Sequence, residues 1–385
     1  MLTVLISGAS VAGPSLAHWL HRQGHAVTVV ERAPEPRRGG FAVDFRGPVH
    51  LEVLRRMGIL DELRAHQTDA GDMWVVGPDG RRRYALPARF TAGDLEVLRG
   101  DLSQVLYDRT RAHVEYVFDD SVDTLTDTPG GVEVTFERGR PRRFDLVVGA
   151  DGLHSRVRRL AFGPEERFLE HLGYYLCGYR TPGLSGQDNV NRLYNEPGRG
   201  VSFGGVEGGA LLVFAAPDLG RVGSERAREV VAERFTGMGW RTAEIVAAAE
   251  QAPEVYFDSI SRVRVPRLSR GRVVLLGDAG YGATCGGLGT GLAVVCAHVL
   301  AGELAAAGGD HRVAFARYEE VVREYTTRCQ KTAGNAGPFL APRTARGIRL
   351  RDAAHRLLTT QPFGAFLNRM STMAAAGLRL PDYPC

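Results

Sequence analysis

The sequence predicts an α/β protein: a doubly wound domain with a parallel sheet, interrupted by an α+β insert with a mostly antiparallel sheet, and followed by C-terminal helices. Three observations predict this class. Residues 2–32 run strand, glycine-rich turn, helix and strand. Two later apolar runs, near 144–150 and 272–278, end in glycine and aspartate. Residues 171–265 differ, because their short strand-like segments are broken by Gly and Pro.

These differences in sequence pattern set the expected domain boundaries. The apolar strands belong to one discontinuous domain, and the broken strands belong to the insert together with helices near 222–236 and 241–251. A long helix near 311–335 and a shorter one near 362–376 close the chain. We expect the parallel-sheet domain at 1–71, 99–170 and 266–325, the insert at 72–98 and 171–265, and a C-terminal helical region at 326–385.

Composition and charge exclude several classes of protein. The 385 residues include 48 Lys or Arg and 44 Asp or Glu, a near balance that does not favour a nucleic-acid partner. The five cysteines form no Cys-x-x-Cys pair, which indicates a reducing compartment and neither a disulfide framework nor a metal site. The chain enters a strand at residue 2 and has no apolar run of membrane length, so we expect a cytoplasmic protein with no membrane partner.

The N-terminal segment carries a dinucleotide fingerprint. After the apolar run "LTVLIS" comes the turn Gly8-Ala9-Ser10-Val11-Ala12-Gly13, and the second strand ends at Glu31. Gly8 permits a tight turn, Gly13 lets the helix pack on the strand, and Ser10 takes the place of the middle glycine. Free N–H groups at the helix start suit a pyrophosphate, and Glu31 is placed to bind a ribose. The pattern fits NAD(P) and FAD equally; the plainer alternative is a glycine turn in an unliganded βαβ unit.

Two further strand ends carry an acid beside a glycine. "FDLVVGADG" ends in Asp151-Gly152 before a helix that Ser155 is expected to cap. Because ligands bind at the carboxyl edge of a parallel sheet, Asp151 is a candidate ligand contact, although a satisfied turn aspartate explains it equally well. "RVVLLGD" ends in Asp278, which can bind a ribose or ribityl hydroxyl. The glycine-rich turn after it, 279–288, leads into a helix near Gly289 and Thr290 that can stabilise negative charge on a flat ring.

These motifs, in this order and spacing, resemble the class A, p-hydroxybenzoate hydroxylase-like, FAD-dependent monooxygenases. Residues 95–109, "LEVLRGDLSQVLYDR", resemble the family helix whose arginine contacts FAD, and 37–48 resemble the loop beside the isoalloxazine ring. The matches cover about 1–160 and 270–330, and the chain looks most like the tetracycline-inactivating and actinobacterial antibiotic-pathway branches. The resemblance implies a Rossmann-like, GR2-type FAD domain. The cofactor contacts it implies are Gly8, Ser10, Ala12, Gly13, Glu31, Arg32, Gly40, Arg46, Arg99, Asp151, Asp278, Gly289 and Thr290.

The resemblance also implies a reaction. NAD(P)H, bound transiently, would reduce FAD, and O2 would add to give a flavin C4a-hydroperoxide that hydroxylates or epoxidises an aromatic or polyketide-like small molecule. Such a reaction belongs to secondary metabolism or antibiotic modification, and needs no metal. No catalytic side chain is expected beyond the loop near the ring, which comprises Gly287, Leu288, Gly289 and Thr290. The sequence leaves open whether the protein is a monomer or a homodimer.

Substrate contacts are expected on the sheet of the insert. In "GYYLCGYR", alternation puts Tyr175, Cys177 and Tyr179 on one face and Tyr174 on the other. Aromatic side chains on a sheet above a flavin can line a pocket for a planar substrate, although an ordinary core position explains them as well. Arg192 is a weaker candidate.

The last motif departs from the family pattern. Gly280 stands where the family has a second alanine, no proline occurs between Asp278 and Gly289, and the turn is one residue shorter. Without the ring of a proline, we expect a more mobile or differently shaped loop beneath the flavin.

Three other readings remain open. A flavoprotein of this fold can catalyse a non-redox step, such as cyclisation or isomerisation, with FAD in a structural role. A drug-sequestering protein with a vestigial flavin domain is another alternative. A flavin-dependent halogenase fits least, because the only lysine, Lys331, lies in a C-terminal helix and the three tryptophans are isolated.

Overall fold

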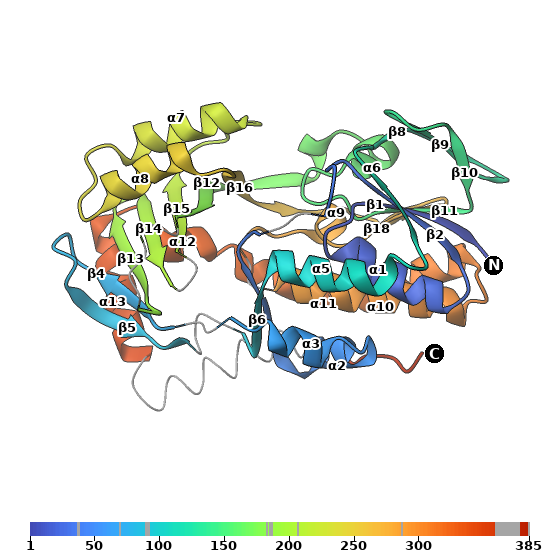
Figure 1. The fold of residues 1–385 in the computed structure, drawn as a ribbon, viewed down its shortest axis with the longest axis horizontal. Coiled ribbons are helices and arrows are strands. Elements are labelled where there is room, and N and C mark those ends of the chain that lie inside the picture. Colours follow the sequence, from blue (N-terminus) through green and yellow to red (C-terminus); the bar gives the residue numbers. More distant parts are fainter. Residues whose placement is uncertain are drawn as a thin grey trace.

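The computed structural model describes residues 1–36, 39–68, 71–88, 93–181, 184, 188–205, 208–285, 288–358 and 378–383. It confirms the α/β class: a parallel sheet with helices and a second, mostly antiparallel sheet lie side by side and are joined by long strands (Figure 1).

The larger half is built on a six-stranded sheet. Its apolar strands are buried on both faces, as expected for a parallel sheet that is covered on both sides. The first strand lies in the interior of the sheet, where Leu5 pairs with Val147 on one side and with Thr28 on the other. The strands, in spatial order, are β17 (Ser269–Arg270), β18 (Val273–Leu275), β11 (Leu146–Gly149), β1 (Thr3–Ser7), β2 (Ala26–Glu31) and β7 (Glu115–Phe118).

Helices and a small sheet cover the two faces of this parallel sheet (Figure 1). One face carries α1 (Ala12–Arg22), α5 (Arg99–Thr110), α10 (Gly289–Ala306) and α11 (His311–Ala333), with α2 (Gly47–Arg56) and α3 (Leu60–Ala65) outside them. The other face carries α6 (Arg156–Phe162) and an antiparallel sheet of β8 (Val122–Thr128), β9 (Gly131–Phe136) and β10 (Arg142–Phe144).

Helix α10 is apolar on every side because it lies inside the core. Among the described residues it alone is long and apolar enough to cross a membrane, but 78% of it is buried within the protein. It packs between α1, α2 and α11. Burial against these helices therefore explains its composition.

The second half is a seven-stranded sheet. Helices α7 (Ser224–Phe235) and α8 (Thr242–Gln251) cover one face, and α12 (Ala336–Leu340) and α13 (Ala345–Leu358) lie on the other side (Figure 1). The one parallel pair joins Asn191 to Met73. The strands, in spatial order, are β16 (Tyr256–Val263), β12 (Leu169–Arg180), β15 (Gly209–Ala215), β14 (Arg199–Gly204), β13 (Asn191–Glu196), β4 (Met73–Val76) and β5 (Arg82–Leu86).

Some elements cross the boundaries expected from the sequence. Strand β6 (Leu95–Leu98), which lies within the expected insert range 72–98, pairs with β3 (Ala42–Phe45) in a two-stranded sheet. Helix α11 is continuous across the boundary at 325/326. The helix expected near 362–376 lies outside the described residues. The remaining short helices are η1 (Glu165–Arg167) and α9 (Asp278–Tyr281).

Candidate active site

The carboxyl ends of three parallel strands meet at one edge of the sheet. β1 ends before Gly8, β11 ends before Asp151, and β18 ends before Gly277. Gly8 has a φ of +111°, and a Cβ there would lie 2.4 Å from the carbonyl oxygen of Ala150, so only glycine fits. A Cβ on Gly277 would lie 3.0 Å from the Cβ of Ala12. The fold therefore brings the first and third motifs into contact.

The start of α1 is shaped for an anion. A Cβ on Gly13 would lie 1.9 Å from the carbonyl oxygen of Gly8, so this glycine allows the helix to begin directly against the turn. The helix has no side-chain cap and no acid in its first turn. Its first N–H groups are therefore left for a ligand. Ser10 is partly exposed in the turn, whereas Ala12 is buried.

Glu31 holds the same turn from the end of β2. Its two carboxylate oxygens accept hydrogen bonds from the backbone N–H groups of Ala9, at 2.9 Å, and Ala33, at 3.0 Å. The side chain remains partly exposed at the sheet edge. The neighbouring Arg32 is exposed.

Asp151 caps a helix. Its carboxylate accepts hydrogen bonds from the hydroxyl of Ser155 and from the backbone N–H groups of Arg156, at 2.8 Å, and Val157, at 3.0 Å. Burial raises its pKa, and these hydrogen bonds oppose the rise. The placement matches the plainer of the two sequence readings, a turn aspartate whose oxygens are already satisfied.

An internal cleft opens around Asp278, the first residue of α9. Solvent reaches the side chains of Asp278, Tyr256 and Cys285, yet all three lie deep enough in the protein for burial to raise their pKa values, to about 12 for Cys285. Accessible surface at such depth indicates the wall of a cleft. Arg99 lowers the pKa of Asp278 against this burial, so it lies within electrostatic reach.

Arg99 and the 39–46 loop lie on one side of this cleft. The backbone N–H of Arg99 bonds to the carbonyl of Phe41 at 3.1 Å, and a Cβ on Gly40, whose φ is +102°, would lie 3.4 Å from the Arg99 Nε. A Cβ on Gly178 would lie 1.7 Å from the Phe41 ring, whose centroid is 6.4 Å from that of Tyr256. The loop is thus wedged against the insert by direct ring contact.

A buried histidine ties this loop to α10. The Nδ1 atom of His50 accepts the backbone N–H of Arg46 at 3.0 Å, and its Nε2 lies 2.7 Å from the hydroxyl of Tyr325. Its ring fills the space that a Cβ on Gly291 would need. Burial, followed by the charge of Arg46, lowers its pKa to about 3, so the ring is neutral. Arg46 itself pairs with Asp44 at 2.6 Å.

The N-terminus of α10 faces the same cleft. Leu288 precedes the helix without a side-chain cap, no acid lies in its first turn, and the only close atom to a Cβ on Gly289 would be Oδ1 of Asp278 at 3.8 Å. Gly289 and Thr290 are partly exposed, as an open helix end requires. Gly287 lies outside the described residues.

The loop without proline is paired to β16. The N–H of Thr284 bonds to the carbonyl of Ser261 at 3.0 Å, and the carbonyl of Gly282 accepts the N–H of Val263 at 2.8 Å. A proline at 284 would remove the first of these donors. Residues 282–285 are therefore connected to β16 by strand-like pairing.

The expected substrate contacts on β12 lie on the face of the seven-stranded sheet that α7 and α8 cover. The hydroxyl of Tyr179 bonds to the carbonyl of Ile245 in α8 at 2.7 Å, and that of Tyr175 bonds to Asp218 at 3.0 Å. Tyr175, Cys177 and Tyr179 are at most 2% exposed. Their side chains pack in the hydrophobic core between this sheet and helices α7 and α8, and not in the cleft. The opposite face carries Gly178, where Phe41 packs.

Arg192 lies on β13, and its guanidinium already contacts other side chains of the protein. It forms an ion pair with Asp188, and its guanidinium lies 5.4 Å from the centroid of the Trp74 ring.

Sequence reasoning missed a charged cluster behind Tyr256. His154 bonds through Nδ1 to Glu165 at 3.0 Å and through Nε2 to Asp258 at 3.1 Å. Glu165 also pairs with the fully buried Arg158 at 3.2 Å. The only sequence signal was an acid at 258 in the strand "VYFDSISRV", two residues after Tyr256 and therefore on the same face of β16.

This cluster makes stability depend on pH. Hydrogen bonds to Asp258 and then Glu165 raise the pKa of His154 to about 9. Because the folded pKa exceeds the unfolded value, the stabilisation is complete below about pH 6.5 and is lost as pH rises through about 9. We expect the free energy of unfolding to fall by about 2 kcal/mol over this interval. Denaturant titrations across the interval test this, with His154→Gln expected to flatten the dependence; an equally steep variant would contradict the assignment.

The chain is similar to known proteins in sequence and in fold. A family model described as an FAD binding domain matches residues 1–333. A flavin-dependent monooxygenase from an unknown prokaryotic organism is 34% identical over 333 residues, which are 84% of this chain and 86% of that protein. The chain belongs to the class A FAD-dependent monooxygenases.

Two further comparisons agree with membership of this monooxygenase family. The crystal structure of the tetracycline destructase Tet(55) is 30% identical, with a TM-score of 0.85, and the match covers 99% of this chain and 98% of that one. An uncharacterised protein of Mycobacterium tuberculosis is 41% identical over 356 residues, 89% of this chain and 95% of its own. The resemblance stated from the motifs is thereby confirmed, and FAD is the cofactor of the family.

The site of this monooxygenase fits FAD. Two helix N-termini without side-chain caps, those of α1 and α10, open at one sheet edge, where backbone donors suit a pyrophosphate and an electron-rich ring. The close contact between Gly277 and Ala12 joins the two motifs, and the cleft beside Asp278 leaves an acidic acceptor accessible between them. An elongated cofactor with a diphosphate and a polyol chain matches this set of donors and acceptors.

Proposed function

We propose that the chain is a monooxygenase that uses FAD, NAD(P)H and O2 to hydroxylate or epoxidise an aromatic or polyketide-like small molecule. The observation that carries this proposal is the accessible Asp278 carboxyl between two uncapped helix N-termini in a chain of this family. The similarity to a tetracycline destructase supports a polycyclic substrate class. Among the described residues, the buried cysteines Cys177, Cys296 and Cys329 form no disulfide, which suits the reducing cytoplasm.

The residues that would hold FAD follow from the geometry. The N–H groups of the Gly8–Gly13 turn would bind the pyrophosphate, and Glu31 the ribose. Asp278 would accept hydrogen bonds from ribityl hydroxyls, with Arg99, which lies within electrostatic reach of it, as a cationic donor. FAD, when bound, supplies the redox chemistry with NAD(P)H and O2.

The remaining groups prepare the surroundings of the reaction. Phe41, packed on Gly178 and beside Tyr256, would exclude water from the cleft at the junction with the insert. The hydroxyl of Tyr256 lies 3.5 Å from Asp258, which in turn bonds to His154. His154, protonated at neutral pH, would hold a proton at Nε2 one carboxylate away from the cleft.

Replacing Asp278 tests the proposed cofactor contact. Asp278→Asn removes a charged acceptor, so we expect FAD to bind about 10- to 100-fold more weakly, the cost of losing charged hydrogen bonds. Fluorescence titration of apoprotein with FAD measures the change. Asp61→Asn is the control, because its carboxylate is almost fully exposed on α3. Equal affinity in both variants would contradict the contact.

Turnover tests the reaction. With the FAD-loaded protein and a panel of aromatic and polyketide compounds, we expect NAD(P)H oxidation to accelerate with at least one compound, and that compound to be converted only in air. Conversion without O2 and without NAD(P)H consumption would favour a non-redox cyclase or isomerase. A purified protein that takes up no FAD would refute both.

A further inference from the structure

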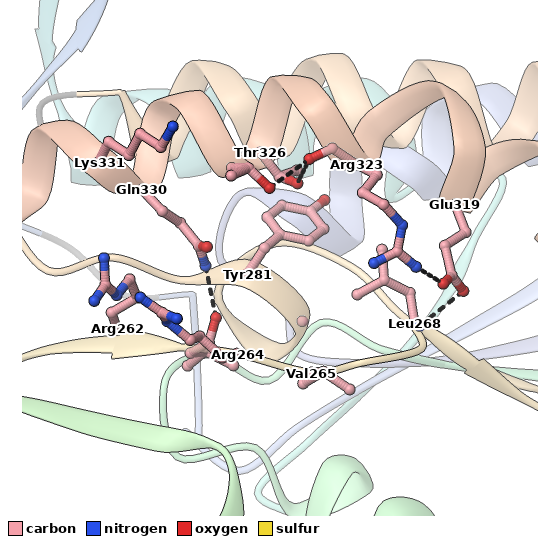
Figure 2. Close-up of a pocket in the computed structure, with 13 residues that line it drawn as sticks. Arg262, Arg264, Val265, Leu268, Tyr281, Glu319, Arg323, Thr326, Gln330 and Lys331 are labelled. Atoms are coloured by element: carbon pink, nitrogen blue, oxygen red, sulfur yellow. Dashed lines mark hydrogen bonds and ion pairs between the residues drawn. The ribbon is translucent and has the colours of Figure 1, made fainter.

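A second cavity lies apart from the cleft at Asp278. Its volume is about 370 Å³, within the range of small-ligand sites. Figure 2 shows it between α11 and the segment 262–268, with Tyr281 between them. Its lining includes neither Asp278, Arg99 nor Tyr256.

The charge of this cavity is strongly positive. Four cationic side chains line it, two from each side: Arg262 and Arg264 from the strand segment, and Arg323 and Lys331 from α11 (Figure 2). Of the described residues that line it, Glu319 alone is acidic.

The cations are only partly compensated. One carboxylate, Glu170, serves two arginines: it lies 2.8 Å from Arg262 and 2.9 Å from Arg264. Glu319 pairs with Arg323, and it also accepts the backbone N–H of Leu268 at 3.0 Å. Two carboxylates thus partly compensate four cations, which suits a ligand with two or more negative charges.

Of the four cations, Lys331 differs from the three arginines in its ion pairing. It is the only lysine in the chain, and among the described residues no carboxylate pairs with it. The side chain of the preceding residue, Gln330, donates a hydrogen bond of 2.6 Å to the carbonyl of Val263. This bond connects the last turns of α11 to the segment 262–268. Lys331 thus lines the cavity as an exposed side chain that no described carboxylate pairs with.

We propose that this cavity binds a phosphate-bearing small molecule. Guanidinium groups present paired N–H donors that match phosphate oxygens, and an ammonium adds a point charge. Exposed ion pairs such as Arg264–Glu170 cost little to open, so the arginines can exchange a carboxylate for a phosphate. The phosphate belongs either to free inorganic pyrophosphate or to a nucleotide such as NADP⁺, and both present the required chemistry.

The position of the cavity distinguishes it from the FAD site. It is lined by Gly280 and Tyr281, the last residues of α9, whereas FAD would be held by Asp278 at the other end of that helix. A ligand here would therefore occupy the back of the loop that supports the flavin. The proposal does not depend on the reaction that the chain catalyses.

Because the chain has one lysine, acylation of its amino group reports directly on ligand binding at the cavity. In the FAD-loaded protein, an N-hydroxysuccinimide ester can acylate Lys331 and the amino group of Met1, and mass spectrometry of peptides separates the two. We expect pyrophosphate, NADP⁺ or both to slow acylation of Lys331 while leaving Met1 unchanged. Protection by pyrophosphate assigns the site to the phosphate group alone, and protection by NADP⁺ only assigns it to the nucleotide. If neither ligand protects Lys331, the proposal is wrong.

Calorimetry with variants locates the binding. Arg264→Gln combined with Lys331→Gln removes two exposed cations, and we expect the protecting ligand to bind about 100-fold more weakly. Arg226→Gln is the matched control, because Arg226 is an exposed arginine of α7 that pairs only with acids of its own helix. Wild-type affinity in the double variant would overturn the proposal, even if Lys331 were protected, because the ligand would then bind elsewhere.

Discussion

Gly13→Ala is expected to lower FAD affinity by about 10- to 100-fold, the range that overpacking of a tight contact produces. The added Cβ would lie 1.9 Å from the carbonyl oxygen of Gly8. Both atoms belong to backbone-fixed positions, so no side-chain rotation can relieve the contact. The start of α1 must move away from the turn, and its N–H groups then no longer point at the pyrophosphate.

Gly223→Ala is the matched control for this change. Gly223 precedes α7 with a φ of −71°, and nothing lies within 4 Å of a Cβ built there. Titration of both apoproteins with FAD should give wild-type affinity for Gly223→Ala alone. If Gly13→Ala bound FAD as tightly as the control, the turn would not be the pyrophosphate site.

Arg158→Met is expected to destabilise the fold by about 3–5 kcal/mol, as when one partner of a buried ion pair is removed. The Arg158 side chain is fully buried. It donates to the carbonyls of Ala279, at 2.9 Å, and Leu153, at 2.7 Å, and pairs with Glu165. Methionine fills most of the volume but leaves these oxygens without a donor.

Its neighbour on α6 gives the control. Arg159 is exposed, so Arg159→Met should change the free energy of unfolding by less than about 0.5 kcal/mol. Denaturant titrations of both variants measure the difference. Equal midpoints would show that the contacts of Arg158 with α9 and Glu165 contribute little to stability.

The motifs of the candidate cofactor site were predictable because their chemistry is local. Gly8, Gly13 and Glu31 lie within one βαβ unit, where spacing fixes geometry. Asp278 follows an apolar strand, and the carboxyl ends of parallel strands share one edge. Each of these inferences needed only the order of residues along a strand or turn.

The sequence could not settle which face of the second sheet meets the cleft. Alternation along β12 separates Tyr175 from Tyr174, but both faces are apolar because helices cover one and the cleft loop and C-terminal helices cover the other. The cluster of His154 and Asp258 was equally hidden. These two residues are 104 positions apart, and only the tertiary fold brings them together.

Isotope labelling shows directly whether an oxygen atom of O2 enters the product. The FAD-loaded protein would be supplied with NAD(P)H, a compound that accelerates NAD(P)H oxidation, and dioxygen made of the heavy oxygen isotope. We expect one heavy oxygen atom in the product, seen by mass spectrometry. A product that carries no heavy oxygen, formed at the same rate when dioxygen is removed, would contradict it.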